Sequence, residues 1–211
     1  CSRDWSSDVC SSDLEKGGIR LGFVGAVTEE TSTLVSPAGI VDIDFDDPLV
    51  AINRVAAQLS DGTDANGEAD VVIALVHDGS NSTSCAAIEA EATNFGDLVR
   101  DASADVDVIF SAHTHMLYNC TIGGRPVVQA ASYATNLAKV VLTIDPDSHA
   151  VLSSASEVLA LPGTPPPTPD PDVLTIVDAA VRAADEVGAL PVGAISADIT
   201  RAYLPGTTTE D

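Results

Sequence analysis

Two apolar runs, each ending beside histidine, constrain the fold of this chain more than any other feature. Residues Val71–Val76 (VVIALV) form a continuous β-branched run of strand length that leads directly into His77. A second run, Val106–Phe110, is followed after two residues by His113 and, one residue later, by His115. Such runs are typical of strands buried on both faces, as in parallel sheets covered by helices. The sequence therefore predicts an α/β fold with histidines at the carboxyl edge of its sheet.

The remaining hydrophobic patterns predict alternating strands and helices. Apolar spacing of three and four residues marks the helices, and continuous apolar runs mark the strands. This order is typical of an α/β domain with a mixed sheet. The expected strands cover residues 19–27, 71–76, 106–110, 127–131 and 140–144, the last two paired antiparallel, and the expected helices cover 48–59, a stretch from 86 or 94 to 102, and 172–187.

The first fourteen residues have a different character from the rest of the chain. They show neither helical nor strand periodicity, and residues 4–14 resemble the in-frame translation of a sequencing-library adapter. We therefore exclude residues 1–14 from fold reasoning as a probable adapter artefact. The natural sequence is then expected to begin near Glu15, in the middle of a gene.

A proline-rich segment, residues 161–171 (LPGTPPPTPDP), predicts a stiff linker because proline removes backbone donors and fixes an extended conformation. The expected organisation is a main domain over 15–160, this linker, a linker helix over 172–190, and the start of a second domain over 191–211. Within that last part, residues 192–199 predict one strand.

The strongly acidic composition limits the partners. Nine Lys and Arg stand against 32 Asp and Glu, a formal net charge of −23, so we expect no binding to duplex nucleic acid. A hydrophobic fraction of 45% indicates a packed globular chain. No apolar run approaches the roughly 18 residues of a membrane span, so no transmembrane segment is expected.

Three of the four histidines follow expected strands, at the edge where α/β sheets bind ligands. In extended backbone His113 and His115 project to the same side. That spacing fits a pair of metal ions roughly 3.5–4 Å apart, and His77 from a neighbouring strand completes the cluster. The alternative is that each histidine is a hydrogen-bonded loop residue. His149 is interpreted as a surface turn residue.

Two motifs carry a family resemblance. His77-Asp78-Gly79 and the run DVIFSAHTH at residues 107–115 resemble the H-[E/D]-G and D-x-I-x-x-G-H-T-H motifs of calcineurin-like metallophosphoesterases, and more closely the 5′-nucleotidase family of secreted and periplasmic enzymes. Residues 22–28, 128–137 and 192–201 are similar to that family in order and spacing. The chain departs from the pattern at Ala112, where the family usually has glycine, and at Asp78, where glutamate is commoner.

The resemblance implies a fold and a metal site. The expected fold is the C-terminal half of a four-layer αββα metallophosphoesterase domain with mixed sheets, followed by a linker helix and the start of a second α+β domain. His77 and His113 would bind one divalent ion and His115 a second, with zinc or manganese as the cofactors. The resemblance places three further motifs of the family before Glu15: Asp-x-His, a bridging Asp and the catalytic Asn-His. No catalytic residue is therefore assigned in this chain, and no substrate-binding residue is identified. We expect this chain alone to be inactive.

In the intact protein the resemblance implies a bacterial, secreted, periplasmic or cell-wall hydrolase of nucleotides, 2′,3′-cyclic nucleotides or nucleotide sugars, acting through hydroxide activated by two metals. Two other interpretations remain open. One is a non-catalytic metal-binding or scaffold protein on the same sheet, and the other is a structural zinc site formed by the three histidines. The sequence does not indicate an oligomeric state.

Cys85 and Cys120 lie in expected loops at the same sheet edge, shortly after His77 and His115. They could meet as a disulfide, which would tie the two histidine-bearing loops together and fit an oxidising compartment. The alternative is two unrelated free thiols.

Overall fold

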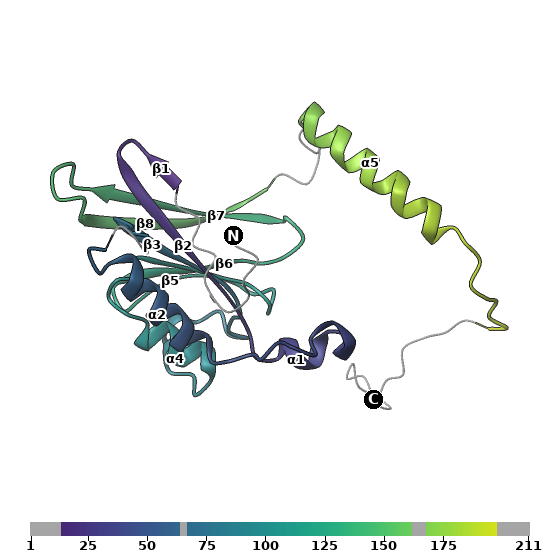
Figure 1. Ribbon diagram of the computed structural model, residues 1–211, viewed down its shortest axis with the longest axis horizontal. Coiled ribbons are helices and arrows are strands. Elements are labelled where there is room, and N and C mark those ends of the chain that lie inside the picture. The colour runs from purple at the N-terminus through teal and green to yellow at the C-terminus, as the bar shows by residue number, and fades with distance from the viewer. Residues whose placement is uncertain (1–13, 64–66, 162–167, 198–211) are drawn as a thin grey trace. The chain divides into compact units, whose positions relative to one another are not determined.

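A computed structural model describes residues 14–63, 67–161 and 168–197 of the chain (Figure 1). Cys1–Thr164 and Pro165–Asp211 form two compact units, and each is described by itself. Most of the first fourteen residues and the end of the second unit lie outside the described residues. The first unit is an α/β structure, as the sequence predicts.

A six-stranded mixed sheet forms the centre of the first unit, in the order β1-β2-β3-β4-β6-β5. The four inner strands run parallel, and the two edge strands are antiparallel to their neighbours. This arrangement places the carboxyl ends of β2, β3 and β4 side by side. The strands are β1 Leu14–Lys16, β2 Ile19–Val27, β3 Val71–His77, β4 Val108–Ser111, β5 Leu117–Ile122 and β6 Arg125–Ala130.

Helices cover one face of this sheet (Figure 1). The helix α2 (Pro48–Leu59) begins at the predicted residue, because Asp47 accepts a hydrogen bond from the backbone N–H of Leu49 at 2.8 Å and Pro48 suits the first turn. Its inward side is fully buried. The other helical segments of this unit are α1 Thr31–Leu34, the 3-10 turn η1 Pro37–Gly39, α3 Cys85–Glu89 and α4 Asn94–Asp101, the last two replacing the single expected helix.

A second, two-stranded sheet lies on the opposite face (Figure 1). It consists of β7 (Asn136–Ile144) and β8 (Val151–Ala160), which pair antiparallel and contact β6. The expected pairing of the strands near residues 127–131 and 140–144 is therefore wrong. The reason is that β5 forms a tight hairpin with β6 through Gly123 and Gly124, whose φ values of 59° and 80° suit a two-residue turn, and so takes the open edge of β6.

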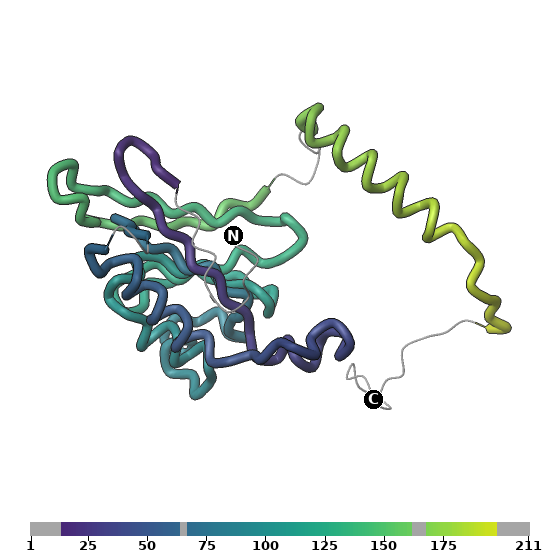
Figure 2. The backbone as a smooth tube through the Cα atoms, in the orientation of Figure 1, coloured from purple at the N-terminus to yellow at the C-terminus, as the bar shows by residue number. Residues whose placement is uncertain are grey.

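The strand β1 was not predicted, and it includes Leu14, the last residue of the segment interpreted as foreign. It pairs antiparallel with β2 through Leu14↔Leu21 and Lys16↔Ile19. Figure 2 shows the tight bend of the chain between the two strands. Gly17 and Gly18 form this bend with φ values of 62° and 82°, which residues with a side chain rarely adopt.

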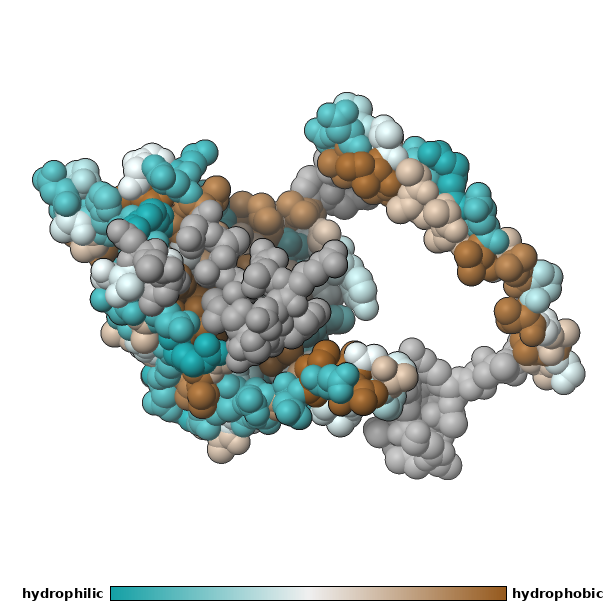
Figure 3. Space-filling model, viewed as in Figure 1, coloured by the Kyte–Doolittle hydropathy of each residue, from teal (hydrophilic) through white to brown (hydrophobic). Residues whose placement is uncertain are grey.

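The described part of the second unit, residues 168–197, contains the helix α5, Pro171–Gly188. Asp170 caps its first turn by accepting hydrogen bonds from the backbone of Asp172 at 2.9 Å and Val173 at 3.2 Å. Figure 3 shows its hydrophobic and hydrophilic residues on different sides of the helix. Residues 192–197 form no strand, and the last two residues of the strand expected over 192–199 lie outside the described residues. Among described helices, none combines the length and apolar character that crossing a membrane requires.

His149 has a structural partner at the other end of the sheet. Its Nδ1 lies 3.0 Å from Oδ1 of Asp70, and Oδ2 of Asp70 accepts the backbone N–H of Arg20 at 2.7 Å. These contacts join the β7–β8 turn to the start of β3. Burial alone would raise the pKa of Asp70, but the Arg20 hydrogen bond and the His149 partner outweigh it and hold this pKa below its ordinary value of 3.8.

A lowered pKa makes the Asp70 contribution to stability dependent on pH. A carboxyl whose pKa is lower in the folded state stabilises the protein above its unfolded pKa, and this stabilisation is lost as the pH falls through the folded value. We expect Asp70→Asn to lower Tm at pH 6, and the gap from the unmodified chain to close below the ordinary pKa of 3.8. Thermal unfolding of both chains from pH 6 to pH 3 checks this, and a gap that stays constant would contradict it.

Candidate metal centre

The candidate site is built where β2, β3 and β4 end together. Val27 lies in register with His77, and Val76 with Ser111, so the three strands stop at nearly the same level. Backbone hydrogen bonds between the strands continue for one residue beyond the strand ends. Thr28 N–H donates to the His77 carbonyl at 3.0 Å, and a second bond joins the loops after β3 and β4. Backbone hydrogen bonds therefore hold all three loops at this edge.

His77 and His113 come together at this edge. Their ring centroids are 5.3 Å apart and the rings meet edge to face at 60°. His77 is the last residue of β3, and His113 follows β4 by two residues. The side chain of His113 is only 22% exposed, so its ring is confined by its surroundings.

His115 is placed differently from the expectation. The segment is not extended, because His113 and His115 have φ values of 69° and 58°, in the left-handed region that residues with a side chain rarely adopt. The alternation of an extended strand therefore does not apply to the two rings. The His115 ring packs edge-on against Tyr133, with centroids 5.4 Å apart.

Asp78 directly follows His77 in the loop after β3, and its carbonyl accepts the backbone N–H of Ala112 at 3.0 Å. Its Oδ1 accepts the backbone N–H of Gly79 at 2.7 Å. Burial raises the pKa of this carboxyl above its ordinary value; the Gly79 hydrogen bond and the charges of His113 and His77 oppose that rise, while Glu30 adds to it. Asp78 also lines the same cavity as His113.

A buried polar network clamps the loop after β3 to the loop after β4. Thr114 Oγ1 donates to the Ser80 carbonyl at 2.7 Å, and Nε2 of Gln129 lies 3.1 Å from the same oxygen of Thr114. Ser80 and Gln129 are each 1% exposed. Because buried polar groups must find partners, this network fixes the spacing of the two loops.

Gly79 allows the close approach of these loops. A Cβ atom at this position would lie 2.5 Å from the carbonyl oxygen of Ala112 and 2.5 Å from Oε1 of Gln129. We expect Gly79→Ala to lower the free energy of unfolding by about 1–3 kcal/mol, because the backbone at one contact must shift. Gly25→Ala is the matched control at the same edge, since a Cβ there meets no atom within 4 Å. Denaturant unfolding compares the two, and equal effects would show that the close approach is unimportant.

Two cavities border the histidine pair. The first, of about 530 Å³, includes His113, and the second, of about 570 Å³, includes His77. The first is lined mainly by acidic and amide side chains, and the second mainly by apolar residues at the strand ends. The lining of the first also includes Glu29, Glu30, Asp78, Asn81 and Glu91, and that of the second also includes Val27, Leu75, Phe110 and Ala112.

The described residues fit part of a metal site. Two imidazoles side by side offer ring nitrogens of the kind that bind zinc or a similar divalent ion. Within residues 14–63, 67–161 and 168–197, however, no group of three or more His, Cys, Asp or Glu side chains converges in a way that could hold an ion. His77 and His113 are therefore two donors that need further ligands, and His115 does not join them in the structure.

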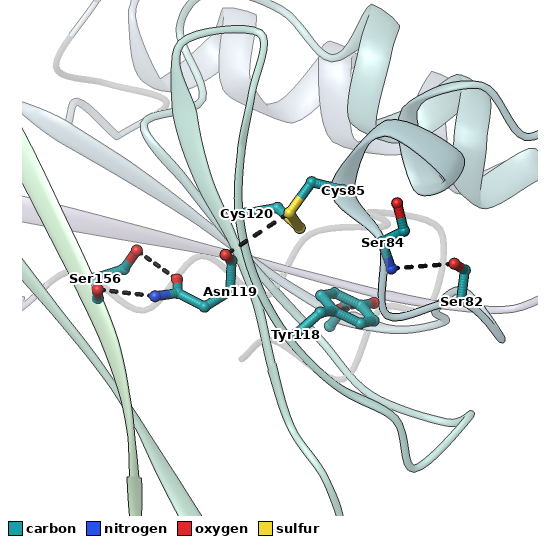
Figure 4. Close-up of a disulfide and its surroundings, with 8 residues drawn as sticks. Ser82, Ser84, Cys85, Tyr118, Asn119, Cys120 and Ser156 are labelled. Carbon is teal, nitrogen blue, oxygen red and sulfur yellow. Dashed lines mark hydrogen bonds between the residues drawn. A yellow bond between two sulfur atoms is a disulfide. The ribbon is translucent and has the colours of Figure 1, made fainter.

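A disulfide braces the same region. Cys85, at the start of α3, is bonded to Cys120 in β5, with Cα atoms 5.4 Å apart (Figure 4). Cys120 is 2% exposed and belongs to the hydrophobic core. The neighbouring Asn119 donates from Nδ2 to the Ser156 carbonyl at 2.9 Å, which joins β5 to β8. The bridge thus holds the loop after β3 against the edge strand of the sheet.

Sequence reasoning missed one residue at the site, Glu30. Its Oε2 lies 3.1 Å from Nε2 of His113. One feature of the sequence could have pointed to Glu30, namely its position, because Glu30 follows β2 just as the histidines follow β3 and β4. An acidic residue in a chain with 32 of them gave no reason to single it out.

Two curated relatives match the chain. Endonuclease YhcR of Bacillus subtilis is 30% identical over 142 residues, 67% of this chain and 11% of that protein. Cell wall protein Lmo0130 of Listeria monocytogenes is 25% identical over 188 residues, 88% of this chain and 24% of that protein. The chain therefore spans less than a quarter of the length of either relative. No known family profile matches it.

Solved structures show the fold. Calcineurin-like phosphoesterase YfkN from Bacillus subtilis superposes with a TM-score of 0.63 at 19% identity, covering 84% of this chain and 57% of that one. The Staphylococcus aureus protein named "Putative 5'-Nucleotidase" superposes with a TM-score of 0.60 at 18% identity, covering 82% of this chain and 34% of that one. The chain has the mixed α/β fold of 5′-nucleotidase-like metallophosphoesterases.

Proposed function

We propose that this chain is the histidine-bearing part of a metal-dependent phosphoester hydrolase. The observation that carries the proposal is the pairing of His77 and His113, with ring centroids 5.3 Å apart at the carboxyl edge of three parallel strands. Two imidazoles from neighbouring strand ends, in a fold shared with phosphoesterases, support a divalent ion at this place. The ligands that complete its shell would come from outside the described residues.

The residues at the strand ends have distinct roles in this proposal. His77 and His113 would hold one ion with ring nitrogens, and His115 would contribute to a second after its ring turns from Tyr133. The Ser80–Thr114 hydrogen bond keeps the two loops at a fixed spacing. Divalent ions in such a centre lower the pKa of bound water and neutralise charge on a phosphoryl group. The histidines act as neutral ligands and transfer no proton.

The proposed substrate is a small phosphoester such as a nucleotide, a 2′,3′-cyclic nucleotide or a nucleotide sugar. Acidic side chains line the first cavity, so an anionic substrate needs the positive charge of bound metal to approach it. The net charge of −23 argues against a duplex nucleic acid as substrate. The name endonuclease belongs to a relative of which this chain matches 11%, and it gives no nuclease role to this part.

The proposed location is outside the cytoplasm. The Cys85–Cys120 disulfide supports an oxidising compartment. One relative is named a cell wall protein, which agrees with this location. A periplasmic, secreted or cell-wall position would all satisfy both observations.

Metal removal tests the proposal in a longer protein that contains this chain. Dialysis against a chelator is expected to lower hydrolysis of bis-p-nitrophenyl phosphate by at least about a thousandfold, since the ions supply several kcal/mol of the catalysis. Zinc or manganese should restore it, and magnesium should restore it less. Activity that survives complete metal removal would refute the proposal.

A further inference from the structure

Within the part of the chain that the structure describes, Glu30 is a charged side chain in direct contact with His113, one of the two candidate metal-binding histidines. Its Oε2 lies 3.1 Å from Nε2 of His113, across the gap between the loops after β2 and β4. We propose that Glu30 is a positioning residue, which fixes the tautomer and orientation of the His113 ring for a metal ion. This inference rests on the proposed function and assigns a role to a residue that no motif in the chain marks.

The backbone around Glu30 is anchored although its side chain is 70% exposed. Thr28 is 6% exposed, and its N–H donates to the His77 carbonyl at 3.0 Å. The side-chain oxygen of Thr28 then accepts the N–H of Glu30 at 3.3 Å. The backbone that carries Glu30 is therefore hydrogen-bonded to the end of β3, and this holds the Glu30 carboxylate near His113.

The chemistry of the pair determines which ring nitrogen is available. An ionised carboxylate can only accept hydrogen bonds, so Nε2 of His113 must be the donor. A neutral ring that donates from Nε2 carries its lone pair on Nδ1. Glu30 therefore presents His113 to a metal through Nδ1. A carboxylate behind a ligating histidine holds the ring in place and makes the nitrogen more basic, and losing such a partner typically costs 10–100-fold in metal affinity.

The chain offers a matched control in the adjacent residue. Glu29 carries the same charge on the same loop, but its Oε2 accepts a hydrogen bond from Nδ2 of Asn94 at 2.9 Å instead of from histidine. Glu29→Ala and Glu30→Ala therefore remove the same charge near the site, and only Glu30→Ala removes the contact with His113. Glu30→Gln keeps an acceptor oxygen and serves as the conservative rescue.

The first measurement is the ¹⁵N chemical shifts of the His113 ring in the metal-free chain at pH 8. We expect one dominant tautomer, with the proton on Nε2, in the unmodified chain and in Glu29→Ala. Glu30→Ala should show a mixture of tautomers, and Glu30→Gln should lie between. This measurement needs no metal, and a loss of folding would be visible in the spectrum of the whole chain. Unchanged His113 shifts in a folded Glu30→Ala chain would overturn the inference.

The second measurement is the zinc affinity of a longer protein that contains this chain and the remaining ligands, from titration of the His77 and His113 ring signals with the ion alone. We expect Glu30→Ala to bind zinc 10–100-fold more weakly than the unmodified chain, and Glu29→Ala to change affinity by less than about threefold. Equal losses of zinc affinity in both variants would show that Glu30 acts only through its negative charge, and this would overturn the inference. If zinc moves neither ring in the longer protein, the proposed function fails, whereas the metal-free shifts still decide whether Glu30 positions His113.

Discussion

Replacing His113 with alanine should lower kcat/KM for phosphoester hydrolysis by at least about a thousandfold in a longer reading frame that contains this chain. The reason is that a lost imidazole weakens the hold on an ion whose charge and bound water supply several kcal/mol of the catalysis. His77→Ala should have an effect of the same size, because the two rings lie side by side at the same strand ends. Steady-state kinetics with added zinc or manganese measures both.

His149→Ala is the control for this prediction. It also removes an imidazole, but that ring pairs with Asp70 at the opposite end of β3. We expect nearly unchanged kcat/KM and a small loss of thermal stability. A thousandfold loss in His149→Ala would show that the loss of activity is not specific to the strand-end histidines. Full activity in His77→Ala and His113→Ala would show that these two are ordinary loop residues.

Breaking the Cys85–Cys120 bridge should be the largest change in stability. The bridge closes a loop with a sequence separation of 35 and joins a core strand to the segment that follows the candidate site. Removing a native disulfide costs about 2–5 kcal/mol. At roughly 2–4 °C of Tm for each kcal/mol in a chain of this size, we expect Cys85→Ala with Cys120→Ala to unfold about 4–20 °C lower.

Reduction provides the control for the disulfide prediction. A reducing agent should lower Tm of the unmodified chain toward that of the double variant, and should not change the double variant. Zinc affinity should also fall on reduction, because the bridge holds the loop that follows His77. A double variant as stable as the oxidised chain would mean that hydrophobic packing around Cys120 suffices without the bond.

The elements with uniform hydrophobic patterns could be predicted from the sequence. The strand β3 is a continuous apolar run, and α2 has regular helical spacing with proline at its start, so local pattern and tertiary packing agree. Buried parallel strands also place their following loops at one edge. That rule alone brings His77 and His113 together, as the structure shows.

The strands with mixed patterns were missed. The strand β5 (LYNCTI) alternates polar and apolar residues, and the Gly123-Gly124 turn after it was a hairpin signal that could have revealed it. Without β5, the edge of β6 was open and the antiparallel pairing with the next strand looked reasonable. The strand β8 is rich in serine and has no apolar run, so its pairing with β7 is decided by tertiary contact.

Side-chain directions at the site could not be predicted from spacing. The left-handed backbone at His113 and His115 depends on tertiary contacts, such as the Thr114 hydrogen bond to Ser80, that no local pattern encodes. For this reason the backbone here departs from the extended strand on which the same-side expectation for the two rings rested. The contact between Glu30 and His113 joins residues 83 positions apart and was invisible for the same reason.

The most direct test of a metal centre at His77 and His113 is an anomalous difference map at the zinc edge, from crystals of the zinc-loaded protein. We expect a peak within bonding distance of one ring nitrogen of each histidine, about 2.0–2.1 Å. The His113 atom should be Nδ1. A map with no peak between these rings, or with zinc only at His149, would contradict a metal centre at His77 and His113.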